Sequence, residues 1–284
     1  MKQLPMLSAL VLGSALAAPV QILAAENFYG DVAGQIGGAN VTVTSVLSNP
    51  NQDPHLFEAS ASTARAVSGA DIIVESGADY DPWMQKLLSA SKNARRTLIT
   101  VADLVGKKVG DNPHVWYDPA TMPAFAKALH AELVRRDPAH KSAYDANLAK
   151  FSASLRPLDG QIARLRARYG GVSVTATEPV FGYMAGALGL RMRDEAFQTA
   201  VMNETEPSAA QTAAFQNGLK TRTAKVLLYN KQVTDPLTER LKKLAAASGV
   251  PVVGVTETQP AGKTYVSWMT SQLSALAAAL AQSK

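Results

Sequence analysis

The sequence predicts an α/β fold of two lobes with parallel β-sheets flanked by helices, joined by one long kinked backbone helix. Three observations predict this fold: continuous apolar runs of strand length, segments of helix length between those runs, and one long helical apolar stripe in the middle of the chain. Apolar runs that do not alternate with polar residues are typical of parallel strands, which are buried on both faces. Their alternation with helices indicates βαβ units.

The individual elements follow from these runs. Strands are expected at residues 20–25, 41–47, 71–75, 97–101, 172–177, 225–229 and 251–255. Helices are expected at residues 121–135 and 208–220, and an amphipathic helix that carries Tyr265, Trp268 and Leu273 closes the chain. Strand-rich sequence therefore lies on both sides of the middle of the chain, which predicts one sheet in each lobe.

The apolar stripe in the middle of the chain predicts the connecting helix. Apolar residues recur at spacings of three and four from Tyr144 to Tyr169, until Gly170-Gly171 ends the pattern. Asp137-Pro138 is a typical helix start, an N-cap followed by proline. Pro157 lies inside the stripe and is expected to bend the helix, but the stripe keeps its phase on both sides. We therefore expect one kinked helix of about 32 residues, roughly 48 Å long.

The N-terminus has the pattern of an export signal. Lys2 precedes an apolar stretch, and Ala15-Leu16-Ala17 is a small-x-small cleavage site. The stretch is too short to span a bilayer, which takes roughly 20 apolar residues, so we expect no direct membrane insertion. A Sec-type signal peptide without a lipobox cysteine predicts a periplasmic protein. The expected organisation is a signal peptide at 1–17, an N-terminal α/β lobe at 18–136, the connecting backbone helix at 137–170 and a C-terminal α/β lobe at 171–284.

The composition limits the chemistry of any site. The chain has no cysteine and only four histidines. The absence of cysteine from the sequence excludes disulfides, thiolate metal sites and a cysteine nucleophile, so a metal ion must be held by His, Asp or Glu. The net charge is +5, and the basic residues are scattered without interleaved aromatic residues. Nucleic acid is therefore not expected as a partner.

Two histidines occupy similar loops in the N-terminal lobe. His55 follows Asp53-Pro54, just after the expected strand at 41–47, and His114 follows Asn112-Pro113. Ligands of parallel α/β sheets bind at the carboxyl ends of strands, and each proline fixes the backbone before its imidazole. A single histidine in a loop is usually a surface residue, but two in one lobe favour a shared site. His130 and His140 fall on helices and are expected to be solvated.

Two carboxylates occupy matching places in the C-terminal lobe. Glu178 follows the strand at 172–177 and Glu257 follows the strand at 251–255. A charge at the end of an apolar strand is costly unless it is paired or binds a cation; a helix N-cap or a surface salt bridge is the alternative for each. Together with His55 and His114, these residues can close a four-ligand cage around a divalent cation, without the open position that catalytic zinc keeps. Such nitrogen and oxygen donors favour Mn²⁺ or Fe²⁺, although intrinsic affinity favours Zn²⁺.

In combination, these motifs resemble the periplasmic metal-binding receptors of zinc/manganese ABC importers. The resemblance covers essentially the whole mature chain. It is carried by residues 53–58, residues 112–116, Glu178 with Phe181-Gly182-Tyr183, Thr205-Glu206-Pro207-Ser208 and residues 255–258. It implies two lobes on a rigid helix, with His55, His114, Glu178 and Glu257 as the metal ligands.

The resemblance also indicates a branch of the family. Glu178 occupies the third ligand position, which is Glu in the manganese/iron branch and His in the zinc branch. The short segment at 106–111 replaces the histidine- and acid-rich loop of many zinc-type members. The fourth ligand is usually Asp, so the longer Glu257 either reaches the metal in a different geometry or does not reach it. Asp53, Trp116 and Asp118 are candidates for side chains that orient the ligands.

We therefore expect a binding protein and not an enzyme. The expected protein is a monomeric periplasmic solute-binding protein that captures Mn²⁺, Fe²⁺ or Zn²⁺ in the cleft between its lobes and delivers it to the membrane permease of an ABC transporter. One alternative is a secreted metal-dependent hydrolase that binds metal through His55, His114 and Glu178 and uses Glu257 as general base. The other is a periplasmic metal chaperone. No His-Glu-x-x-His or Gly-x-Ser-x-Gly motif supports a hydrolase.

Overall fold

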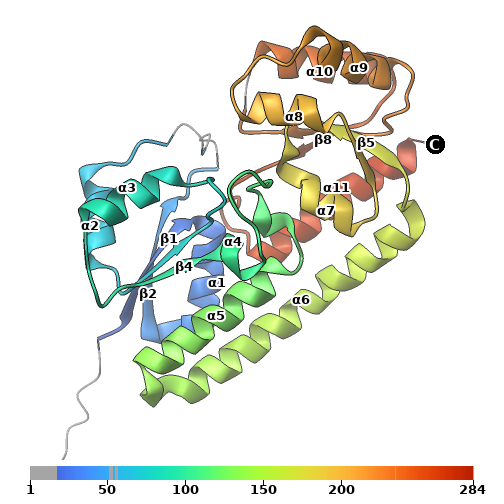
Figure 1. Cartoon of the computed structure of the whole chain (residues 1–284). Helices are drawn as coiled ribbons and strands as arrows, with labels where there is room; N and C mark the ends of the chain where they lie inside the picture. The colour runs from blue at the N-terminus through green and yellow to red at the C-terminus, as the bar shows by residue number, and fades with distance from the viewer. Residues whose placement is uncertain (1–17, 51–53, 55–56, 234, 284) are drawn as a thin grey trace, which may run out of the picture.

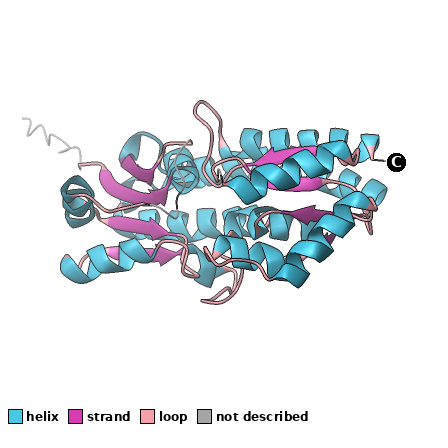
Figure 2. Ribbon diagram, turned by 90° about the horizontal axis from the view of Figure 1, so that it is seen from above, coloured by secondary structure: helices cyan, strands magenta, loops and turns pink. Residues whose placement is uncertain are grey.

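The computed structural model describes residues 18–50, 54, 57–233 and 235–283. These residues form two parallel four-stranded sheets, each flanked by helices (Figures 1 and 2). The helix α6 (Lys141–Tyr169) runs along both lobes. The predicted fold class, two α/β lobes joined by one long helix, is thereby confirmed. The predicted signal peptide at 1–17 lies outside the described residues.

The N-terminal lobe contains the four strands that the sequence predicts for it. Their order in the sheet is β2-β1-β3-β4, and all neighbours are parallel. The strands are β1 (Val20–Glu26), β2 (Val41–Leu47), β3 (Ile72–Glu75) and β4 (Thr97–Thr100). The helices are α1 (Asn27–Gly37), α2 (Ala61–Gly69), α3 (Pro82–Ala90), α4 (Val101–Leu104) and α5 (Thr121–Arg136), with short 3₁₀ turns at η1 (Gly38–Asn40) and η3 (Val115–Tyr117).

The C-terminal lobe contains one strand more than predicted. The sheet order is β6-β5-β7-β8, again with parallel neighbours. The strands are β5 (Ser173–Ala176), β6 (Arg191–Arg193), β7 (Leu227–Asn230) and β8 (Val252–Val255). The helices are α7 (Gly182–Ala187), α8 (Glu195–Met202), α9 (Ala209–Lys220), α10 (Pro236–Ala247) and α11 (Tyr265–Gln282), with a 3₁₀ turn at η5 (Pro179–Phe181). The additional strand, β6, lies at the sheet edge with two exposed arginines, so it has no apolar run.

The connecting helix is a single element, as its apolar stripe predicts. Its first turn, η4 (Pro138–His140), is a 3₁₀ turn, and the 29 residues of α6 follow with Pro157 inside the helix. Its buried face packs on α1 and α5 of the N-terminal lobe and on α11 of the C-terminal lobe. The helix therefore connects the lobes as a packed structural element rather than as a free linker.

One apolar core passes through both lobes. Phe28 of α1 packs against Trp116, with ring centroids 4.7 Å apart, and against Trp268 of α11 at 5.7 Å. All three side chains are buried, and they belong to one cluster that extends from Ile22 to Leu280. Aromatic pairs at these distances contribute beyond their burial alone. The lobes are thus in contact through buried aromatic side chains. Within the described residues, no helix has both the length and the apolar character that a membrane crossing requires.

Candidate metal centre

The candidate site lies where residues from the ends of both sheets meet. His114 directly precedes η3 in the N-terminal lobe, and Glu257 follows β8 in the C-terminal lobe. His114 Nε2 lies 3.3 Å from Glu257 Oε2, and both side chains are 0% exposed. The structure therefore brings together one predicted nitrogen ligand and one predicted oxygen ligand, each from a different lobe.

The imidazole of His114 is oriented by Asn112. Asn112 Oδ1 lies 2.7 Å from His114 Nδ1 and also accepts the main-chain N–H of His114 at 3.1 Å. Because the amide oxygen is an acceptor, it favours the tautomer with the proton on Nδ1, which directs the Nε2 lone pair towards Glu257. Asn112 Nδ2 donates to the carbonyl of Pro179 at 2.7 Å, so the same side chain also contacts the C-terminal lobe.

The carboxylate of Glu257 has a hydrogen-bond donor at each oxygen. The Tyr80 hydroxyl donates to Oε2 at 2.8 Å, and Asn230 Nδ2 donates to Oε1 at 2.5 Å. The main-chain N–H of Glu257 donates to Gln232 Oε1 at 2.6 Å. Asn230 ends β7 beside β8, whereas Tyr80 comes from the loop after β3 in the other lobe. The orientation of this carboxylate is therefore determined by both lobes.

Tyr80 remains a neutral donor. Burial, together with the nearby carboxyl groups of Glu257 and Glu26, raises the pKa of the Tyr80 phenol well above its usual value. Three successive residues before it have positive φ: 76° at Gly77, 51° at Ala78 and 67° at Asp79. Such angles are uncommon for residues other than glycine and cluster at functional sites. The turn thus adopts an unfavourable backbone conformation immediately before the residue that reaches Glu257.

A group of buried acids lies at the carboxyl ends of the N-terminal strands. Glu26 ends β1, Glu75 ends β3, and Asp81 follows in the loop before α3. Burial, with a further contribution from Glu75, raises the pKa of Asp81 to about 7. Burial and the neighbouring Asp81 and Glu75 raise the pKa of Glu26 well above its usual value. Asp81 also accepts the main-chain N–H of Ser76 at 2.7 Å and that of Gly77 at 3.0 Å. This carboxyl group therefore stabilises the start of the turn that presents Tyr80.

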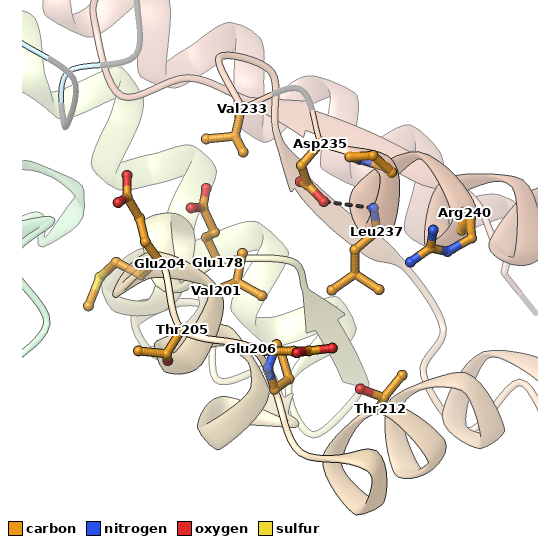
Figure 3. Close-up of a pocket in the computed structure, with 13 residues that line it drawn as sticks. Glu178, Val201, Glu204, Thr205, Glu206, Thr212, Val233, Asp235, Leu237 and Arg240 are labelled. Atoms are coloured by element: carbon orange, nitrogen blue, oxygen red, sulfur yellow. Dashed lines mark hydrogen bonds between the residues drawn. The ribbon is translucent and has the colours of Figure 1, made fainter.

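Glu178 lies at the end of β5, two residues beyond the strand, and is 5% exposed. It occupies the N-cap position of η5 without a capping hydrogen bond from its side chain, so it does not serve as a helix cap. It lines a cavity of about 610 Å³ with Glu204, Glu206, Asp235 and Arg240 (Figure 3). In this view the carboxylates of Glu178 and Glu204 point in the same direction. The Thr205-Glu206-Pro207 motif therefore lies beside a predicted ligand.

The complete four-ligand cage stays a prediction. His55 and Asp53 lie outside the described residues. In the ranges that the structure describes, no three His, Asp or Glu side chains are close enough together to hold a metal ion. Of the predicted ligands in those ranges, His114 and Glu257 are paired, and Glu178 is placed at a strand end of the same lobe as Glu257.

The side chains around the predicted ligands match those expected only in part. Trp116 does pack near His114, with ring centroids 5.2 Å apart, but Asp118 Oδ1 instead accepts the main-chain N–H of Ala120 in a turn. The side chains that hydrogen-bond the predicted ligands His114 and Glu257 are Asn112, Tyr80 and Asn230. The sequence carries a local signal for Asn112. In an Asx turn, the side-chain oxygen of Asn accepts the main-chain N–H two residues later, which here belongs to His114. Tyr80 and Asn230 carry no comparable local signal.

A family model described as the periplasmic component A of the zinc-uptake complex, ZnuA, matches residues 22–279. The chain belongs to this family. The resemblance identified from the sequence motifs is thereby confirmed. The match to the ZnuA family includes residues of both lobes and the connecting helix. The matched family and the relatives give no support to a hydrolase or a chaperone.

Proteins similar to this chain include substrate-binding lipoproteins of ABC transporters. The metal ABC transporter substrate-binding lipoprotein SloC of Streptococcus mutans is 24% identical, over 92% of this chain and 90% of SloC. The manganese ABC transporter substrate-binding lipoprotein PsaA of Streptococcus anginosus is 21% identical, over 93% of this chain and 90% of PsaA. The solved structure of the periplasmic zinc-binding protein TroA of Treponema pallidum has a TM-score of 0.77 at 20% identity, over 93% of this chain and 99% of TroA, which shows a shared fold.

Proposed function

We propose that this chain is the periplasmic solute-binding protein of an ABC importer, which captures a divalent transition-metal ion between its lobes and delivers it to a membrane permease. The paired His114 and Glu257 carry the proposal, since an imidazole nitrogen and a carboxylate oxygen lie 3.3 Å apart and fully buried. Tyr80 and Asn230 donate hydrogen bonds to this buried carboxylate, and a bound cation would further compensate its charge. A metal ion bound to both side chains supplies such a cation.

The proposed ligands are His55, His114, Glu178 and Glu257. Two neutral imidazoles and two carboxylates give a site whose charge cancels that of a divalent ion. Such donors suit Mn²⁺, Fe²⁺ and Zn²⁺. The names of PsaA and TroA, which state manganese transport and zinc binding, support Mn²⁺ and Zn²⁺ as cargo.

The remaining parts of the proposal concern the organisation of the protein. Residues 1–17 serve as the export signal, and the mature protein acts in the periplasm as a monomer. The N-terminal lobe at 18–136 supplies the two imidazoles, and the C-terminal lobe at 171–284 supplies the two carboxylates. Because α6 packs on helices of both lobes, capture and release involve a small rocking of the lobes. The protein binds and carries the ion without a chemical reaction.

Native mass spectrometry before and after chelation tests this proposal. The wild-type protein is expected to retain one metal ion per chain, and His114→Ala is expected to retain none. His130→Ala is the matched control, because His130 is partly exposed and its Nε2 lies 2.7 Å from Asp145 Oδ1, away from the candidate site. A wild-type protein that retains no ion, or a His114→Ala variant that retains as much as wild type, contradicts the proposed function.

A further inference from the structure

The Tyr80 hydroxyl connects the N-terminal lobe directly to a proposed ligand of the C-terminal lobe. It donates to Glu257 Oε2 at 2.8 Å, across 177 positions of sequence. The acceptor, Oε2, is the carboxylate oxygen that lies 3.3 Å from His114 Nε2. Tyr80 therefore contacts the ligand on the side where the metal ion is proposed to bind.

The second anchor of this carboxylate lies on its other oxygen. Asn230 Nδ2 donates to Oε1 at 2.5 Å, from the strand next to the one that leads to Glu257. Hydrogen bonds to an ionised acceptor are among the stronger ones in proteins. Two donors, one at each oxygen, fix the plane of the carboxylate. If one donor is removed, the group can rotate about the remaining hydrogen bond.

The loop that carries Tyr80 has a geometry that fits a positioning role. Gly77, Ala78 and Asp79 all have positive φ, and Asp81 accepts main-chain N–H groups at the start of this turn. An unfavourable backbone conformation persists only when its surroundings enforce it. Here the surroundings hold the Tyr80 phenol, which is 4% exposed, against Glu257.

We propose that Tyr80 is a specificity-determining positioning residue, which holds Glu257 so that Oε2 alone binds the ion. This inference rests on the proposed function and concerns the choice of metal. Zn²⁺ in proteins almost always takes four ligands in a tetrahedral arrangement, and a carboxylate that offers one oxygen suits it. Mn²⁺ favours a larger number of oxygen ligands. A Glu257 carboxylate held with only Oε2 towards the ion therefore raises the affinity for Zn²⁺ relative to Mn²⁺. The comparison is with the same site when the carboxylate is free to offer both oxygens.

Tyr80→Phe tests the inference, because it removes one oxygen atom and leaves the ring. Dissociation constants for Zn²⁺ and Mn²⁺ are measured anaerobically by competition with a chelator of known affinity. The ratio of the Mn²⁺ constant to the Zn²⁺ constant is expected to fall about tenfold, because the released carboxylate can offer Mn²⁺ its second oxygen. Tyr265→Phe is the matched control. The buried Tyr265 hydroxyl also donates between the lobes at 2.8 Å, but to the carbonyl of Trp116, so the ratio is expected to be unchanged.

The outcomes separate positioning from a general structural role. Weaker binding of both metals by the same factor in Tyr80→Phe, or a ratio equal to that of Tyr265→Phe, overturns the inference. If far-UV circular dichroism shows that Tyr80→Phe does not fold, Asn230→Ala decides, because it releases the other oxygen and is expected to lower the same ratio. An unchanged ratio in Asn230→Ala then overturns the inference. A wild-type protein that binds neither metal overturns the proposed function itself, which is a distinguishable result.

Discussion

The Nε2 atom of His114 and the Oε2 atom of Glu257 lie 3.3 Å apart, and neither side chain is exposed to solvent. Glu257→Gln preserves the shape of the side chain and removes its charge. Removing one partner of a buried ion pair typically costs about 3 to 5 kcal/mol of stability. We expect a loss of the same order in the free energy of metal binding, so affinity for Zn²⁺ or Mn²⁺ is expected to fall by about a hundredfold or more. Isothermal titration with each metal measures the change. The control is Glu239→Gln on α10, a partly exposed residue that pairs with Lys242; equal losses in both variants contradict the prediction.

Asn112 orients the imidazole of His114 through the contact with Nδ1. Asn112→Ala is expected to weaken metal binding by about 10- to 100-fold, because residues that orient a ligand typically contribute this much. Asn112→Asp keeps an acceptor next to Nδ1 and is expected to restore part of the affinity. Chelator competition compares the three proteins. An Asn112→Ala variant with wild-type affinity means that the contact does not orient a ligand.

Gly37 permits the close packing between the end of α1 and β2. A Cβ atom at position 37 would lie 2.3 Å from both Cγ atoms of Val41, a side chain with little rotational freedom. Gly37→Ala is expected to lower the free energy of unfolding by about 1 to 3 kcal/mol, measured by urea denaturation. Gly34→Ala, in the same helix, is the control, because a Cβ there meets no heavy atom of the described residues within 4 Å. It is expected to raise the free energy of unfolding by about 0.5 to 1 kcal/mol. Equal effects of the two substitutions contradict this explanation.

Asp81 makes the stability depend on pH. Burial raises its pKa from 3.8 to about 7, so the folded chain binds this proton more tightly than the unfolded chain. The resulting stabilisation is complete below about pH 4 and is lost as the pH rises through about 7, a difference of about 4 kcal/mol. Asp81→Asn is expected to flatten the decrease in unfolding free energy between pH 4 and pH 7, measured by urea denaturation. Asp159→Asn, an exposed residue of α6, is the control. A slope that survives in Asp81→Asn assigns the pH dependence to other groups.

The predicted elements are those with a local pattern in the sequence. Strands buried on both faces leave continuous apolar runs, and all seven predicted strands are present. The strand β6 was not predicted. It is three residues long and lies at a sheet edge with two exposed arginines, so it leaves no apolar run in the sequence. The connecting helix was predictable because its apolar stripe keeps one phase through Pro157. Its first turn is 3₁₀ rather than α-helical, which such a stripe does not specify.

The candidate site was predictable to the extent that ligands lie beside strand ends. Glu178 and Glu257 follow apolar strands, and the structure pairs Glu257 with His114. The residues that orient this pair depend on contacts between distant segments, which a local pattern does not contain. Tyr80 and Asn230 reach Glu257 from 177 and 27 positions away. The roles of His55, His114, Glu178 and Glu257 as metal ligands stay predictions, and His55 also lies outside the described residues.

The apolar core that joins the lobes has a consequence for folding. Phe28 packs against Trp268, and α6 buries one continuous face against helices of both lobes. Neither lobe can therefore complete its core without the other. The chain is expected to unfold in a single cooperative transition in calorimetry, and a fragment that ends at the end of α6 is expected not to fold by itself. We therefore expect the two lobes to fold as one unit.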